Sequence, residues 1–173
     1  MTLEVRLMTE AETQLITDYF RNSTPEHLEV LGVDPSRLPP DQEAWRERFR
    51  RFFAKPLAER ENIQLVWLEN GRAVGFSTAD RIVFREHARM HLHVIAPDDR
   101  HRGIGAPCVK QSARIYFQTL ALKRLYCEPN ALNVAPNRTL QAAGFRYVKT
   151  YMTVPGWINF HQPVTQWVLE ELS

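Results

Sequence analysis

Two histidines stand one residue apart in the segment HLHVIA, residues 91–96. Apolar and polar residues alternate along residues 89–96, which predicts a β-strand with His91, His93 and Ile95 on one face. An unperturbed imidazole has a pKa of about 6.5, so either histidine could take a proton from a substrate near neutral pH. The alternative is that one or both imidazoles pack within a sheet with their nitrogens satisfied.

A glycine-rich loop follows the histidines, with the sequence RHRGIGAP at residues 100–107. Its last residue, a proline, suits the first turn of a helix, whose unpaired backbone N–H groups attract anions. Gly103 and Gly105 let an anion approach closely, and Arg100 and Arg102 add charge-assisted hydrogen bonds. The spacing fits neither the phosphate loop GxxxxGK followed by Ser or Thr nor the dinucleotide fingerprint GxGxxG. The loop predicts a phosphate or pyrophosphate site, with an ordinary glycine turn as the alternative.

The elements around these two segments alternate between strands and helices. A hairpin is the clearest of them, because the Asn-Gly pair at residues 70–71 favours a type I′ turn between two β-rich runs. Thr9 and Glu12 stand at capping-box spacing before a first helix, and a second helix is expected from about Asp41. The expected order is β-α-α-β-β-β-α-β-α-β-β, with residues 22–40 as loop or broken helix. This order predicts an α/β or α+β fold with a mixed sheet and helices on both sides.

The composition of the chain argues against nucleic-acid-binding, membrane-spanning and metal-binding functions. The chain has 173 residues, and we expect one domain over residues 1–173. Its formal charge of +2 is too small to indicate nucleic acid binding, and the arginines of the second helix are interpreted as a solvated face: Arg46, Arg48, Arg50 and Arg51. No apolar run reaches the roughly 20 residues of a membrane span, and no signal peptide is recognisable. Cys108 and Cys127 form no ligand cluster, so we expect reduced thiols, no metal and a cytoplasmic location.

Together these motifs resemble the GNAT superfamily of acetyl-CoA-dependent N-acyltransferases. Residues 100–106 match the family pattern Arg/Gln-x-x-Gly-x-Gly/Ala, and Asn133 and the AAGF of residues 142–145 follow at the expected distance. The resemblance covers about residues 63–170 and reaches the N-terminal helices only by their order. It implies a mostly antiparallel central sheet flanked by helices on both sides. Two branches look closest, the ribosomal-protein N-terminal acetyltransferases and the acetyltransferases of hydroxylysine-type amines in siderophore synthesis.

The resemblance also implies a cofactor site for acetyl-CoA. In the family, the amides of the glycine loop bind the pyrophosphate of coenzyme A. Backbone groups of the preceding strand, here around Ile95, hold the pantetheine and the acetyl carbonyl, and the asparagine, here Asn133, contacts the pantetheine arm. The expected cofactor-binding residues are therefore Ile95, Arg100, Arg102, Gly103, Ile104, Gly105, Ala106, Asn133 and Asn137.

Acetyl transfer would require a base. An alkyl ammonium cannot attack a thioester, and with a pKa of about 10.4 only about 0.04% of it is neutral at pH 7. His91 and His93 are the first candidates for removing the proton, and Glu128, at the end of the next expected strand, is the rival. Arylalkylamine N-acetyltransferases are similar in carrying an HLH segment on this strand. Many GNAT enzymes place a thiolate-protonating tyrosine seven residues after the asparagine, but Leu140 stands there, so no tyrosine acid is assigned.

The acceptor site is expected between the early helical region and the segment PGWINFHQP, residues 155–163. Trp157, Phe160 and His161 offer aromatic surface for an apolar or cationic acceptor, or else Trp157 and Phe160 cap the core. We expect acetyl transfer to the primary amine of a small molecule. The alternatives are a protein N-terminal amine, a CoA-binding module without turnover and, last, a nucleic-acid binder. Pairing of the closing strands across a homodimer stays open.

Overall fold

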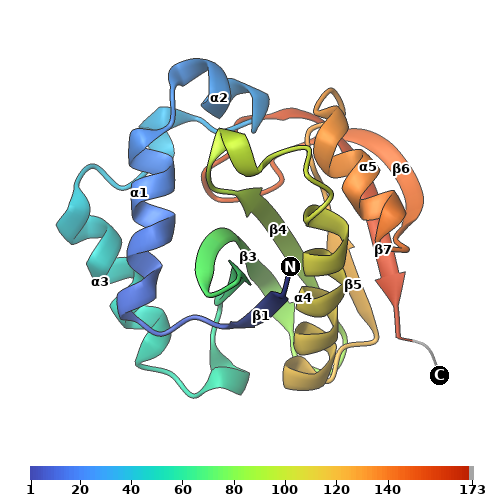
Figure 1. Cartoon of the computed structure of the whole chain (residues 1–173), viewed down its shortest axis with the longest axis horizontal. Helices are drawn as coiled ribbons and strands as arrows, with labels where there is room; N and C mark the ends of the chain where they lie inside the picture. Colours follow the sequence, from blue (N-terminus) through green and yellow to red (C-terminus); the bar gives the residue numbers. More distant parts are fainter. Residues whose placement is uncertain (172–173) are drawn as a thin grey trace.

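A seven-stranded sheet forms the centre of the computed structural model, which describes residues 1–171 (Figure 1). The strand order is β1-β2-β3-β4-β5-β7-β6, and every neighbouring pair is antiparallel except β4 and β5. The mixed, mostly antiparallel sheet expected from the sequence is thus confirmed. The strands are β1 (Leu3–Leu7), β2 (Ile63–Glu69), β3 (Arg72–Val83), β4 (His87–Val94), β5 (Arg124–Cys127), β6 (Arg146–Thr153) and β7 (Gln162–Glu170).

Helices cover both faces of the sheet, as expected (Figure 1). On one face lie α1 (Gln14–Asn22), α2 (Pro25–Val30) and α3 (Gln42–Phe53), and on the other lie α4 (Gly105–Leu120) and α5 (Val134–Ala142). Each face has its own apolar core, because alternate strand residues point to opposite sides. Leu65 and Trp67 pack with the α4 side, whereas Val66 and Phe76 pack with α1 and α3. No helix among residues 1–171 is long and apolar enough to cross a membrane.

Local sequence signals account for several element boundaries. The Thr9 and Glu12 pair forms the expected capping box, since each side chain accepts a hydrogen bond from the other residue's backbone N–H. Asp41 is the N-cap of α3, and its side chain accepts a hydrogen bond from the Ala44 backbone N–H. Asn70 and Gly71 have φ angles of 49° and 81°, as a type I′ turn requires. Residues 22–40 agree with the second of the two expectations, a broken helix, because they contain the short helix α2 and a 3₁₀ turn at Pro35–Arg37.

The separation of β4 from β5 positions the site. The two strands pair only along the first half of β4, and β4 continues past the end of β5. The Ile95 N–H donates to the Val74 carbonyl at 2.9 Å. Because backbone groups in a strand alternate in direction, those of Leu92 and Val94 point away from β3 and toward the side that β5 has left. The edge of β4 thus offers free N–H and C=O groups between the two helical layers.

Candidate active site

Two pockets meet beside β4. The loop pocket is lined by residues 99–106, by residues of α5 and by Tyr19 and His27. The aromatic pocket lies under α1 and α3 and is lined also by residues of β3, β4 and the segment 155–159. Leu92, His93 and Asn133 line both pockets. The loop pocket has a volume of about 600 Å³ and the aromatic pocket one of about 110 Å³, so the first suits a long ligand and the second a small group.

The loop pocket is built around the N-terminus of α4. Its backbone is tightly wound, with positive φ angles at His101 (61°) and Gly103 (77°). A Cβ at Gly103 would meet no atom within 4 Å, whereas a Cβ at Gly105 would lie 3.0 Å from the Thr139 side chain. Gly103 is therefore required by backbone conformation, and Gly105 by the close approach of α4 and α5. The turn directs backbone N–H groups and the positive end of a 16-residue helix to one place, as an anion site needs.

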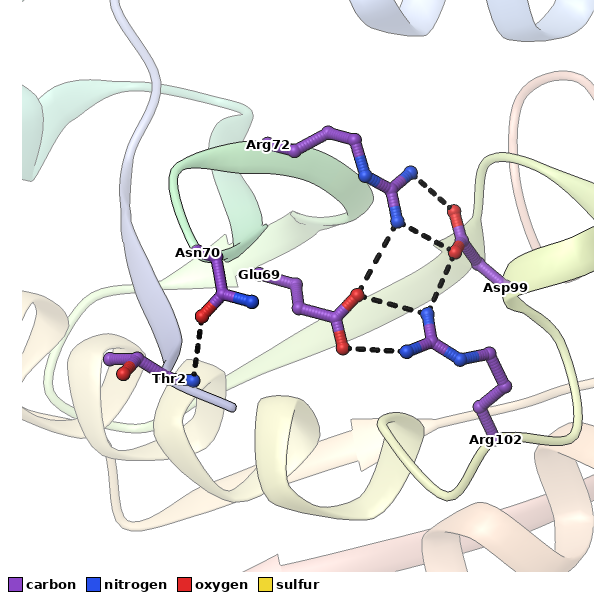
Figure 2. Close-up of polar contacts among 6 residues, drawn as sticks. All are labelled: Thr2, Glu69, Asn70, Arg72, Asp99 and Arg102. Atoms are coloured by element: carbon purple, nitrogen blue, oxygen red, sulfur yellow. Dashed lines mark hydrogen bonds and ion pairs between the residues drawn. The ribbon is translucent and has the colours of Figure 1, made fainter.

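Four charged side chains brace this loop against the β2–β3 hairpin (Figure 2). Arg102 donates to Glu69 at 2.8 and 2.9 Å and to Asp99 at 2.9 Å, while Arg72 donates to Asp99 at 2.8 Å through both terminal nitrogens and to Glu69 at 3.3 Å. The hydrogen bonds from Arg72 hold the pKa of Asp99 below its ordinary value, and those from Arg102 do the same for Glu69. The Arg102 guanidinium, expected to meet a phosphate, is instead engaged by two carboxylates.

Arg100 is placed differently, although the sequence treats the two arginines alike. It lines the loop pocket, and its Nη2 lies 3.2 Å from Nε2 of His27, which is also 2.8 Å from the Tyr19 hydroxyl. Burial, with a further contribution from Arg100, lowers the pKa of His27, which favours a neutral imidazole that accepts these hydrogen bonds. Arg138 of α5 also lines the pocket, a residue that the sequence analysis missed. Within residues 1–171 neither Arg100 nor Arg138 forms an ion pair.

Two residues expected to bind the cofactor have other partners. Asn137 donates to the carbonyl groups of Asn133 and Asn130 and accepts from Trp167 Nε1 at 2.8 Å, so its amide ties α5 to β7. The Ile95 N–H is paired with β3, and its side chain packs in the core under α1 and α3. Neither residue lines the loop pocket, and the free backbone groups belong to the residues just before Ile95 in β4. Asn133 lines both pockets, as its expected role requires.

The aromatic pocket combines apolar walls with a few charged groups. Its walls are the rings of Phe20, Trp45, Phe49, Phe52, Phe76 and Trp157. Asp80 of β3 and His91 of β4 lie in it side by side, with Asp80 Oδ1 3.2 Å from His91 Nε2 but without the alignment of a hydrogen bond. Burial acts to raise the pKa of Asp80, but the charges of His91 and Arg89 outweigh it, and the pKa is lowered. The His91 side chain lines the pocket and is 25% exposed, while its Nε2 is buried against the Asp80 carboxylate.

His93 lies in a different environment on the same face. Its ring stands between those of Tyr19, Phe20 and Phe76 at centroid distances of 4.9–5.4 Å. The His93 side chain is partly exposed and lines both pockets, but its Nδ1 is buried without a hydrogen-bond partner. Burial, together with His91, His27 and Arg100, lowers the pKa of His93 to about 3. Such a weakly basic imidazole is poorly suited to the proton removal expected of it.

Glu128 follows β5 and is fully enclosed. Its Oε1 accepts hydrogen bonds from the Tyr151 hydroxyl at 2.5 Å and from Gln166 Nε2 at 2.6 Å, and Arg89 Nη1 lies 3.1 Å from its Oε2. The carboxylate borders the aromatic pocket, but these three groups already surround it. Its geometry is that of a carboxylate that joins β4, β6 and β7 rather than of a base open to an acceptor.

The expected acceptor residues separate into one that lines the pocket and two that do not. Trp157 forms a wall of the aromatic pocket. Phe160 and His161 line neither pocket; the Phe160 N–H donates to the Gly32 carbonyl, and His161 is exposed. Arg48, interpreted from the sequence as solvated, instead lies with its guanidinium carbon 3.5 Å from the centroid of Trp157. Among residues 1–171 no cluster of three or more His, Cys, Asp or Glu side chains could hold a metal ion.

Comparison with known proteins adds to this geometry. The family model described as "Acetyltransferase (GNAT) domain" matches residues 2–146. No curated protein matches the sequence. Among solved structures, the aminoglycoside acetyltransferase AAC(6')-Ib in complex with coenzyme A has 15% identity, a TM-score of 0.72 and coverage of 98% of this chain and 95% of that one. The spermidine N-acetyltransferase of Vibrio cholerae in complex with CoA and spermine has 13% identity, a TM-score of 0.74 and coverage of 97% and 95%. RimL, a ribosomal L7/L12 α-N-protein acetyltransferase in complex with coenzyme A, has 15% identity, a TM-score of 0.76 and coverage of 98% and 94%.

Proposed function

We propose that this chain, which belongs to the GNAT acetyltransferase family, transfers an acetyl group from acetyl-CoA to the primary amine of a small molecule. The observation that carries the proposal is the meeting of an anion-binding loop pocket with a small aromatic pocket at the free edge of β4. A long cofactor in the first pocket would present its thioester to an amine in the second. The three structural neighbours described above are complexes with CoA, which supports this assignment of the loop pocket.

In this proposal the loop pocket binds coenzyme A mainly through backbone groups. The pyrophosphate lies at the N-terminus of α4 against the amides of residues 102–106, and Arg100 supplies the side-chain cation. The Arg102 guanidinium holds the loop in place through its ion pairs with Glu69 and Asp99. Its backbone N–H, rather than its guanidinium, would then contact the pyrophosphate. The pantetheine arm runs along the edge of β4 past Asn133, where the N–H and C=O groups of Leu92 and Val94 have no strand partner.

The chemistry requires one base and one oxyanion site. His91, with the Asp80 carboxylate beside it, takes a proton from the ammonium form of the acceptor, and the neutral nitrogen attacks the thioester carbonyl carbon. A free N–H of β4, at Leu92 or Val94, stabilises the oxyanion of the tetrahedral intermediate. The C–S bond then breaks, and the thiolate takes a proton from the amine nitrogen, directly or through water. Leu140 is buried in the core, so this chain offers no side-chain acid at the position of the family's tyrosine.

The size of the aromatic pocket favours a small molecule over the N-terminus of a folded protein. Its walls come from four separate parts of the chain, residues 16–62, 76–93, 127–136 and 155–162, and its volume is about 110 Å³. The test is release of free thiol from acetyl-CoA, followed across a panel of small primary amines and short peptides. We expect release with at least one small amine and none with peptides. Binding of acetyl-CoA without release in any case would identify a binding module, and release with peptides alone would favour the protein acceptor.

A further inference from the structure

Arg48 lines the aromatic pocket but, unlike the other charged residues there, has no partner for its charged group among residues 1–171. It belongs to α3, where Arg46, Arg50 and Arg51 are exposed, and where Arg46 pairs with Glu43 and Arg50 with Glu47 at 2.6 Å. Arg48 instead lines the pocket and is half-buried. Within the described residues 1–171 its guanidinium forms no ion pair and no hydrogen bond. Its contacts are the faces of Trp157 at 3.5 Å and Phe52 at 5.2 Å from its carbon.

This arrangement leaves a cation without an ion-pair partner among residues 1–171 at a place that water only partly reaches. Burial and the charge of Arg51 lower the pKa of Arg48, although the charges of Asp80 and Glu61 act in the opposite direction. Stacking on Trp157 fixes the plane of the guanidinium but uses none of its N–H groups, which lie in that plane. A planar guanidinium with free N–H groups matches a carboxylate, which can accept two parallel hydrogen bonds from it.

The other charges of the pocket lie in the β-sheet. Asp80 and His91 stand together on β3 and β4, and Glu128 is matched by Arg89. An ammonium group would thus be attracted to Asp80, while Arg48 would repel a second ammonium and attract an anion. The rings of Phe20, Phe76 and Trp157 add apolar surface to the same pocket.

We propose that the acceptor is an amine that also carries a carboxylate, joined by an apolar body, with Arg48 as the residue that binds the carboxylate. This inference rests on the proposed acetyl transfer and names its substrate class. It sets this pocket apart from one for polyamines or other polycations, because Arg48 places a fixed positive charge where such a substrate would need a negative one.

The test compares matched pairs of amines that differ only in the carboxylate. Suitable pairs are phenylalanine with phenethylamine, tryptophan with tryptamine, and 4-(aminomethyl)benzoate with benzylamine, with spermidine as a polycation. We expect kcat/KM to be about tenfold to a hundredfold higher for the carboxylate member of at least one pair, and spermidine to be poor. In Arg48→Gln this preference should fall to near unity, because kcat/KM should fall more for the carboxylate-bearing amine than for the plain amine. Arg48→Lys should retain only part of it, since an ammonium cannot form the bidentate contact.

Arg50→Gln is the matched control, because Arg50 belongs to the same helix but is exposed and pairs with Glu47. It should leave the preference unchanged. Equal rates for both members of every pair in the wild type, or an equal loss for both members in Arg48→Gln, would overturn the inference and leave Arg48 as a support for Trp157. Calorimetric titration of the carboxylate-bearing amines in the presence of coenzyme A provides a readout without turnover. Arg48-dependent binding without thiol release would refute the acetyl transfer alone, and thiol release without the preference would refute the carboxylate alone.

Discussion

The loop pocket and the aromatic pocket are built in opposite ways. In the proposed function the loop pocket binds its ligand mainly through backbone groups of one continuous stretch, residues 99–106, with Arg100 beside them, while Glu69, Arg72, Asp99 and Arg102 brace the loop (Figure 2). The aromatic pocket takes its chemistry from side chains of α1, α3, β3, β4 and the segment 155–159. A backbone site can bind the same phosphate groups whatever the acceptor is. A side-chain site can change its acceptor through single substitutions, so the two halves of the reaction are separable in this chain.

Removal of the proposed base should have the largest effect. His91→Ala should lower kcat by about a hundredfold or more, the range expected for loss of a general base, while affinity for acetyl-CoA stays within about twofold. Steady-state kinetics and calorimetric titration with acetyl-CoA measure the two quantities. His93→Gln is the comparison, because His93 lies on the same face with a pKa of about 3 and should matter for packing more than for the acid limb of the pH–rate profile. A larger loss of kcat in His93→Gln than in His91→Ala would reverse this assignment.

A substitution at Gly103 tests whether CoA binds to the backbone of the loop. Valine there would be strained at a φ of 77°, so Gly103→Val should move the loop and weaken CoA binding by about tenfold or more. Gly71→Val is a matched control, since Gly71 has a φ of 81° and also has open space around its Cα, but it lies in the β2–β3 turn. Both variants should lose a similar free energy of unfolding, about 1–2 kcal/mol, in urea titrations. Equal CoA affinity in the two variants would contradict a backbone site at residue 103.

Variants of Arg100 and Arg102 should affect different quantities, CoA affinity in the first case and the free energy of unfolding in the second. Arg100→Gln should reduce CoA affinity by roughly tenfold, the value of one charge-assisted contact, with little change in unfolding free energy. Arg102→Gln should show the reverse, a smaller loss of affinity and a lower unfolding free energy, because Glu69 and Asp99 would lose a shared partner. Calorimetric titration with CoA measures the affinity of both variants, and urea titration measures their free energy of unfolding. If Arg102→Gln lost more affinity than Arg100→Gln, the guanidinium of Arg102 would have to leave its carboxylates to meet the cofactor.

The contrast between the two pockets also explains what the sequence could predict. The hairpin turn, the capping box, the strand that carries His91 and the glycine loop are signals within a few residues of one another, and the structure has all of them. Local signals could not separate Arg100 from Arg102, because the partners of Arg102 include Glu69, which lies 33 residues away. They could not place Arg48 either: its helical pattern resembles that of Arg50, and only contact with Trp157 distinguishes it. Its position between Trp45, Phe49 and Phe52 was the one available hint.

The smallest expected effect concerns the brace itself and its dependence on pH. The pKa of Asp99 is held below its ordinary value by Arg72 and Arg102, so its charge stabilises the folded loop above that ordinary value, and the stabilisation is lost as the pH falls through the lowered pKa. The unfolding free energy of the wild type should therefore decline as the pH is lowered below about 4, and Asp99→Asn should flatten part of this decline while being less stable at pH 7. Because the arginines are partly exposed, salt should weaken the difference. Parallel pH profiles for wild type and Asp99→Asn would show that the charge of Asp99 adds no pH-dependent stability to the fold. The comparison of Arg100→Gln with Arg102→Gln would then depend on CoA affinity alone.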